Sequence, residues 1–258
     1  MSSAPTTGAP PTGARPPDWA TLVLAGNPGP MTLTGTNTWV LAAPSDDECV
    51  VVDPGPAEAR HLEVVLAAVG GRLVRTVLVT HGHHDHVDGV AALVERTGAK
   101  VPVAAEGSTI EGAGLRIDVL ETPGHTADSR CFVVGQTMLT GDTVLGSGTS
   151  VVAWPDGDLA DYLRSLRRLD ALAAAGSVTR MLPGHRPVID DPEAVCRHYL
   201  AHRLERIGQV RRAVEDGADG PDDVVARVYP DLIGTMRDAG LRTVRATLAY
   251  LDAESDGR

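Results

Sequence analysis

The chain has 258 residues, a formal net charge of −11 and 43% hydrophobic residues, which suits one large domain with a sizeable core and a small appendage. No apolar run is long enough to span a bilayer, and three cysteines without a paired spacing exclude a disulfide framework. These features indicate a cytoplasmic protein, and the acidic balance argues against duplex nucleic acid as its main partner.

The first 17 residues are rich in Ser, Thr, Ala, Gly and Pro, and Arg15 is their only charged residue. They lack the apolar stretch of a signal peptide, so we expect a disordered tail over residues 1–17. Beyond it, apolar runs typical of strands alternate with helical patterns. The predicted strands cover residues 38–42, 49–52, 74–79, 101–104, 115–120, 131–134 and 178–182.

Helical periodicity predicts two helices among these strands. The first has apolar residues at i, i+3, i+4 and i+7, which form one face of a helix: Leu62, Val65, Leu66 and Val69. Asp158 can cap the second helix. The apolar face of that helix consists of Leu159, Leu163, Leu166 and Leu169.

The stretch Thr80-His81-Gly82-His83-His84-Asp85-His86 follows a predicted buried strand and contains four potential metal ligands, His81, His83, Asp85 and His86. Imidazole mixed with carboxylate suits zinc or a similar ion. A lone histidine is more often an ordinary core or surface residue, but that interpretation does not explain four ligand-type residues at this density. Upstream, Asp53 ends a predicted strand in a turn that is either plain or a support for such a histidine.

Three later segments each place one ligand-type side chain just beyond a predicted strand. The ligand-type residue is His125 in the segment Thr-Pro-Gly-His, Asp142 in Leu-Thr-Gly-Asp and His185 in Leu-Pro-Gly-His. One such turn alone is ordinary, but loops at strand ends bring distant residues into one cleft. With the four residues of the cluster they make seven candidate ligands, the number that a two-metal site needs.

From about Pro192 the pattern becomes helical throughout. We expect one helix with an apolar face, a short helix over residues 222–228 and a last helix. The expected apolar faces are Leu200, Leu204, Ile207, Val210 and Val214 in the first, and Leu241, Val244, Leu248 and Leu251 in the last. This part is not basic, with ten Arg against thirteen Asp and Glu from Asp191 onward. Arg242 and Arg245 either touch phosphates or form part of a solvated helix face.

The pattern His-x-His-x-Asp-His, followed by His125, Asp142 and His185, resembles the metallo-β-lactamase superfamily. Within it, residues 141–146, 154–159 and 199–203 are similar to the group that contains the mitochondrial β-lactamase-like endoribonuclease and its bacterial relatives. The resemblance covers about residues 20–250. It implies an α/β fold, with an αββα metallo-β-lactamase sandwich over residues 18–190. A small all-helical, truncated winged-helix-like domain would follow over residues 191–258.

The resemblance also implies two divalent metal ions and assigns the ligands. One ion would be held by His81, His83 and His125, the other by Asp85, His86 and His185, with Asp142 bridging them. Zinc is favoured, and Mn²⁺ or Fe²⁺ also suit these ligands. Two ions roughly 3.5–4 Å apart make hydroxide available at neutral pH. Asp85 and Asp142 are the expected catalytic carboxylates, Asp85 orienting that hydroxide and Asp142 offsetting the repulsion between the ions. His84 is not expected to be a ligand, and it would either face solvent or contact a ligand from outside the site.

The implied activity is hydrolysis by a metal-bound hydroxide. Antibiotic hydrolysis is disfavoured, because true β-lactamases of this fold commonly use a cysteine ligand and all three cysteines here lie in apolar patterns. The resemblance implies endoribonuclease-type cleavage of single-stranded RNA. The alternative is hydrolysis of a small ester or thioester, as in the glyoxalase II branch, and the charge of −11 suits it better. A third alternative is a non-catalytic metal-binding scaffold, against which seven intact ligands argue.

Overall fold

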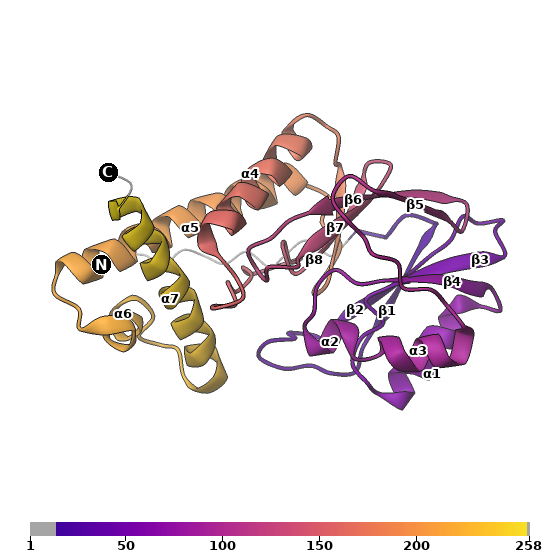
Figure 1. Cartoon of the computed structure of the whole chain (residues 1–258), viewed down its shortest axis with the longest axis horizontal. Helices are drawn as coiled ribbons and strands as arrows, with labels where there is room; N and C mark the ends of the chain where they lie inside the picture. The colour runs from indigo at the N-terminus through magenta and orange to yellow at the C-terminus, as the bar shows by residue number, and fades with distance from the viewer. Residues whose placement is uncertain (1–13, 257–258) are drawn as a thin grey trace.

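The computed structural model describes residues 14–256 and arranges their strands in two sheets (Figure 1). Each sheet follows chain order, and all neighbouring strands are antiparallel except the last pair of each sheet, β3–β4 and β8–β9. The first sheet comprises β1 (Ala20–Leu24), β2 (Asn37–Leu41), β3 (Glu48–Val52) and β4 (Leu73–Leu78). The second comprises β5 (Thr109–Gly112), β6 (Leu115–Glu121), β7 (Arg130–Val134), β8 (Thr137–Gly141) and β9 (Arg180–Pro183).

The inner faces of the two sheets form one hydrophobic core. It joins Val50 of β3 to Ile117, Phe132 and Leu139 of the second sheet, and each of these side chains is at most 1% exposed. The outer side of the first sheet is covered by α1 (Ala59–Val69) and α3 (Val90–Thr97) (Figure 1). Because β3 is buried on both faces, it is a continuous apolar run and does not alternate.

The outer face of the second sheet packs against α4 (Leu159–Ala174) and α5 (Pro192–Glu215) (Figure 1). Strand alternation explains this second core, because Cys131 and Met138 point away from the side that Phe132 and Leu139 occupy. After α5 come α6 (Gly220–Val228) and α7 (Gly234–Asp256), which pack against α5 around the fully buried Val244. The α/β sandwich with a C-terminal helical region is therefore confirmed.

Most predicted elements are present, but the strand predicted over residues 101–104 is wrong. That segment is irregular, with Val103 92% exposed, because no neighbouring strand pairs with it beyond one isolated bridge at Lys100. Four further elements, β1, β5, α2 (His84–Val87) and α3, were not predicted from the sequence. The predicted α5 face is also partly wrong, since Leu204 and Val214 are exposed and the buried residues include Tyr199 and Arg203.

Residues 191–256 contain helices and no strand that would form a wing hairpin. Because the buried face of α5 shares a core with α4, the domain boundary between residues 190 and 191 stays a prediction. Most of the tail expected over residues 1–17 lies outside the described residues. Among the helices of residues 14–256, none combines the length and apolar character of a membrane span.

Candidate metal centre

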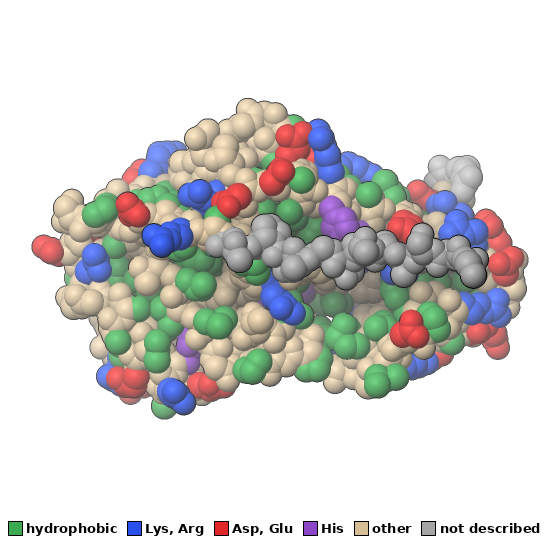
Figure 2. All heavy atoms as spheres, turned by 180° about the vertical axis from the view of Figure 1, so that it is seen from behind, with side chains coloured by type: hydrophobic (Ala, Val, Ile, Leu, Met, Phe, Trp, Pro, Cys, Tyr) green, Lys and Arg blue, Asp and Glu red, His purple; other side chains and the backbone are tan. Residues whose placement is uncertain are grey.

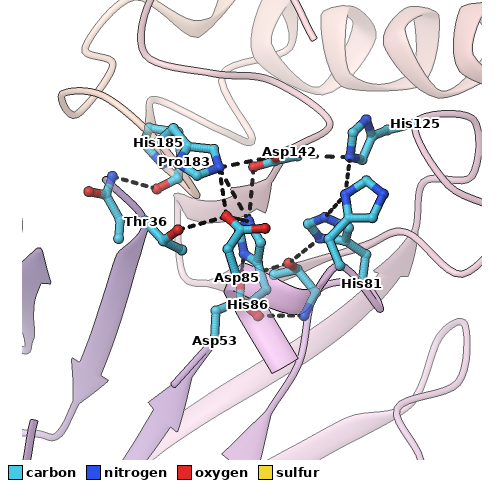
Figure 3. Close-up of polar contacts among 12 residues, drawn as sticks. Thr36, Asp53, His81, Asp85, His86, His125, Asp142, Pro183 and His185 are labelled. Carbon is cyan, nitrogen blue, oxygen red and sulfur yellow. Dashed lines mark hydrogen bonds and ion pairs between the residues drawn. The ribbon is translucent and has the colours of Figure 1, made fainter. Parts of the chain in front are cut away.

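Seven predicted ligand side chains converge at one edge of the sandwich, in loops that follow β4, β6, β8 and β9 (Figure 3). The short helix α2 (His84–Val87) carries two of them, and His83 stands just before it. Loops after neighbouring strand ends bring residues that are far apart in the sequence to one place. The structure brings together His81, His83, Asp85, His86, His125, Asp142 and His185.

The first ligand group consists of His81, His83, His125 and Asp142. His83 Nδ1 lies 2.9 Å from His81 Nε2 and 3.1 Å from His125 Nε2. One ligand atom from each of the four residues lies within 4.8 Å of all the others. This is a spacing that one metal ion can span.

The second ligand group consists of Asp85, His86 and His185. Asp85 Oδ2 lies 3.3 Å from His86 Nε2 and 3.4 Å from His185 Nε2. Asp142 stands between the two groups, because its oxygens lie 3.5 Å from His86 Nε2, 3.4 Å from His185 Nε2 and 3.8 Å from His125 Nε2 (Figure 3). A carboxylate in this place is within reach of both ligand groups.

Four of the five histidines in these groups are held from behind through the ring nitrogen that faces away from the site. These nitrogens contact Asp53 Oδ2 (from His86, 2.9 Å), the Gly35 carbonyl (from His185, 3.0 Å), the Val151 carbonyl (from His125, 2.6 Å) and Thr80 Oγ1 (from His81, 3.0 Å). An N–H donated outward leaves the lone pair of the other nitrogen directed inward. His83 differs, since its Nδ1 faces the site.

Two supporting residues lie outside the ligand motifs. The Asp53 carboxylate accepts hydrogen bonds from the Thr80 amide and hydroxyl, both at 2.7 Å. The structure therefore favours the supporting interpretation of the Asp53 turn over a plain turn. Thr36 donates its hydroxyl to Asp85 Oδ2 at 2.7 Å, while its amide donates to Asn27 Oδ1 at 3.0 Å. Thr36 was not predicted from the sequence, because no ligand-type residue or repeated turn marks its segment.

The site has the features of a cation cradle. Asp142 Oδ1 is buried and accepts no hydrogen bond, which is costly without a positive partner. Gly184 keeps the space beside it open, because a Cβ there would lie 2.5 Å from Asp142 Oδ1 and 2.8 Å from His86 Cε1. Inward-facing imidazole nitrogens and a carboxylate oxygen without a hydrogen bond are the donor set of a borderline divalent ion. The residues present therefore fit divalent metal binding.

The electrostatics differ between the two groups. Burial lowers the pKa of His81 and His83 and lowers that of His125 to about 4, so these rings are neutral near pH 7. Burial also disfavours a charge on His185, but Asp142 and Asp85 outweigh it and raise its pKa to about 10.

The carboxylates show the converse effect. Burial alone would raise the pKa of Asp142 and Asp85, but neighbouring His185 and His86 hold both far below the ordinary value. Both carboxylates are therefore ionised near pH 7. The negative charges of Asp85 and Asp142 favour nearby positive charge. Protons on His86 and His185 supply it in the absence of a metal ion.

The residues that were not expected to be ligands belong to neither ligand group. The His84 side chain is 94% exposed and lies 3.1 Å from Asp88. Cys49, Cys131 and Cys196 are buried and free, and none belongs to a ligand group. The absence of a cysteine ligand distinguishes this site from the cysteine-containing pattern considered in the sequence analysis.

A cavity of about 330 Å³ opens from the ligands toward α7. Its floor includes His83, Asp85, His125, Asp142 and His185. Apolar side chains form much of its wall. Met31 and Leu33 come from the loop between β1 and β2, Leu145 and Val151 from the segment after β8, and Met236 from α7. This wall was not predicted from the sequence, because single apolar residues in loops carry no pattern.

Comparison with known proteins agrees with this geometry. The family described as the metallo-β-lactamase superfamily matches residues 31–116, which include the histidine cluster. The β-lactamase-like protein 2 homolog of Caenorhabditis elegans is 30% identical over 259 residues, which cover 91% of this chain and 84% of that protein. An atrochrysone carboxyl ACP thioesterase of Aspergillus fumigatus is 34% identical over 212 residues, covering 75% of this chain and 64% of that protein.

Solved structures agree as well. A metallo-β-lactamase family protein of Thermus thermophilus has a TM-score of 0.72 at 25% identity, with 92% of this chain and 94% of that chain covered. A β-lactamase domain protein of Burkholderia ambifaria has a TM-score of 0.79 at 19% identity, with 96% and 91% covered, and shows the shared fold. The chain therefore belongs to the metallo-β-lactamase superfamily.

Proposed function

We propose that this protein is a dinuclear metal-dependent hydrolase whose substrate is an acyl thioester. The observation that carries the proposal is a pair of ligand groups that share Asp142 and form the floor of a cavity with an apolar wall. The first ion would be held by His81, His83 and His125 and the second by Asp85, His86 and His185, with Asp142 between them.

Two divalent ions in these groups would supply Lewis acidity and make water easier to deprotonate. In the reaction, the oxygen of water bonds to the thioester carbonyl carbon, the C–S bond breaks, and the departing sulfur takes up a proton. Asp85 is the carboxylate placed to orient the attacking water, because its side chain lines the cavity and Thr36 fixes one of its oxygens. Its low pKa makes it a hydrogen-bond acceptor and a poor store for a proton.

The cavity lining favours an acyl thioester over RNA. Contacts with phosphates draw on Lys and Arg, and unpaired bases stack on aromatic side chains. The cavity directly over the ligand groups has no Lys, Arg, Phe, Tyr or Trp in its lining, and the chain carries a net charge of −11. The similar Aspergillus fumigatus protein is named a thioesterase, which supports the same choice.

The test is a substrate panel for the metal-loaded protein, with zinc and manganese preparations assayed separately. An acyl thioester, the matching oxygen ester and a labelled single-stranded RNA are each incubated with wild type and with Asp142→Asn. We expect thiol release from the thioester by wild type and its loss in the variant. RNA cleavage that depends on Asp142, without thioester hydrolysis, would instead make the protein a phosphodiesterase.

A further inference from the structure

Two further cavities continue from the metal centre along α7. One, of about 330 Å³, lies between His83, His125 and Val151 on one side and Asp238 and Arg242 on the other. The next, of about 640 Å³, is lined by His83, Trp154 and Pro155 together with Arg242 and Arg245. His83 lines these two cavities and the ligand cavity, and Arg242 lines both outer ones, so the three cavities adjoin one another and together are called the cleft. Figure 2, which views the molecule from behind relative to Figure 1, shows a hollow near the middle with hydrophobic side chains around it.

Among the described residues, Arg242 and Arg245 form no ion pair with a carboxylate, and they line the cavities beside the metal centre. Arg203, Arg206 and Arg212 of α5 also lack such an ion pair, but none of them lines these cavities. Other arginines of the C-terminal helices form one: Arg227 with Asp223 at 2.7 Å, Arg237 with Asp222 at 2.7 Å and Arg211 with Glu254 at 2.9 Å. Asp238 and Asp156 line the same cavities, yet neither reaches a guanidinium within ion-pair distance. Two exposed positive charges are thus left free in a chain of net charge −11.

The helix holds this pair in place. Arg242 and Arg245 are three residues apart and lie on one side of α7. Val244, which lies between them in the sequence, is fully buried and anchors another side of α7 against α5 and α6. Two guanidinium groups presented side by side from a rigid helix are suited to bind a phosphate, which accepts several charge-assisted hydrogen bonds at once.

We propose that Arg242 and Arg245 bind the phosphate of a phosphorylated pantetheine arm that carries the acyl group, an inference that rests on the proposed thioester hydrolysis. The acyl chain occupies the apolar cavity beside Met31 and Met236, and the thioester lies over the ligand groups. The arm leaves past His83 along α7 to the arginines. Such an arm occurs on coenzyme A and on carrier proteins, and both present the same phosphate.

The kinetic test compares an acyl phosphopantetheine with the same acyl pantetheine, which lacks the phosphate. In the double variant Arg242→Gln/Arg245→Gln, kcat/KM for the phosphorylated substrate should fall roughly tenfold or more, mainly through KM, since charge-assisted hydrogen bonds are lost. Hydrolysis of acyl pantetheine should stay at the wild-type rate. Arg242→Lys/Arg245→Lys should restore part of the loss, because it keeps the charge without the planar fork. Arg60→Gln, an exposed arginine on α1, is the matched control.

A binding measurement separates this inference from the proposed function. The S-methyl thioethers of phosphopantetheine and pantetheine cannot be hydrolysed, so calorimetric titration reports binding alone. Tighter binding of the phosphorylated probe in wild type, lost in the double variant, supports the arginine site even if no thioester is hydrolysed. Equal affinity for both probes, or equal kinetics of wild type and double variant on both substrates, would overturn it.

Two further arms resolve the source of the phosphate. Acyl-coenzyme A and an acylated carrier protein are compared as substrates of wild type and of the double variant. Whichever substrate has the larger arginine-dependent kcat/KM identifies the source, and dependence in either supports the inference. If the arginines are needed for binding a single-stranded RNA and not for either phosphorylated pantetheine, the inference is wrong and the cleft is a nucleic-acid site.

Discussion

Asp142 is the residue on which both ligand groups depend. Its oxygens lie within 3.8 Å of three histidine nitrogens drawn from both groups, and its Oδ1 accepts no hydrogen bond. Asp142→Ala should therefore abolish hydrolysis and reduce the bound metal, because the two cations lose the anion between them. Metal content by mass spectrometry and thioester turnover report the two effects. His84→Ala, which removes an exposed imidazole from the same segment, should leave the bound metal nearly unchanged. Wild-type metal content in Asp142→Ala would contradict the assignment.

Gly184 tests how tightly the ligands are packed. A Cβ at this position would lie 2.5 Å from Asp142 Oδ1, far inside van der Waals contact, so Gly184→Ala should displace the carboxylate or the loop. We expect turnover to fall at least tenfold, since small misplacements of reacting groups are costly. Gly26→Ala, at an exposed glycine whose Cβ would meet open space and whose φ is not positive, controls for the loss of a glycine. Unchanged kcat/KM in Gly184→Ala would show that the cradle is looser than the structure indicates.

Some residues of the site can be predicted from the sequence and others cannot. The convergence of the seven candidate ligands was predictable, because His81, His83, Asp85 and His86 stand in one short segment and the other three follow strands. Thr36 and Ser150 were not, because their roles come from tertiary contacts: Thr36 bonds Asp85, and Ser150 Oγ lies 3.1 Å from His125 Nδ1. A hydroxyl in a loop has no local signature for such a contact.

At the scale of elements, α5 connects the C-terminal helices to the metal centre through Arg203. This side chain is 3% exposed, donates to the Ser150 carbonyl and lies 5.2 Å from the centre of the Tyr162 ring. Ser150 in turn contacts His125. Arg203→Met should lower the free energy of unfolding by about 1.5–3 kcal/mol, the typical contribution of a hydrogen bond to a charged group. Urea unfolding checks this, with the exposed Arg211→Met as control; equal losses in both variants would contradict a special role for Arg203.

His202, next to Arg203 on α5, gives a pH dependence of known sign. Burial, together with Arg203 and Arg206, lowers its pKa to about 4, whereas the unfolded value is about 6.5. Between these values the unfolded chain binds a proton that the folded chain refuses, so this histidine makes folding less favourable as pH falls from about 6.5 toward 4. His202→Gln removes the effect. In urea unfolding, the free energy of unfolding of His202→Gln relative to wild type should rise as the pH falls from 7.5 to 5. A difference that stays constant with pH would refute this origin.

Elements were predictable where the local pattern and the tertiary environment agree. The helix capped by Asp158 is one case, because the predicted cap accepts a hydrogen bond from the Asp161 amide at 2.8 Å. The segment 101–104 is the opposite case, since apolar residues without a partner strand stay irregular. The α5 face failed for a similar reason: the helix packs on α4 at one end and on α6 and α7 at the other, so no single stripe is buried along its length.

At the scale of the whole molecule, residues of the sandwich and of the C-terminal helices pack together in one buried cluster. Cys196 and Tyr199 of α5 pack in one cluster with Tyr162 and Leu166 of α4, each at most 1% exposed. We therefore expect residues 1–258 to unfold in one transition and residues 1–190 alone to be unstable, because the outer face of α4 would be exposed to water. Far-UV circular dichroism and tryptophan fluorescence should give coincident urea curves. A soluble, cooperatively folding fragment 1–190 would show that the two parts are independent.

The number of metal ions that each chain binds at saturation is the most direct test of a two-metal hydrolase. We predict two equivalents of zinc or manganese, one in the group of His81, His83 and His125 and one in the group of Asp85, His86 and His185. Elemental analysis after equilibrium dialysis gives this number, and His185→Ala should lower it to one. A single equivalent in wild type, unaffected by loss of His185, would contradict a two-metal hydrolase.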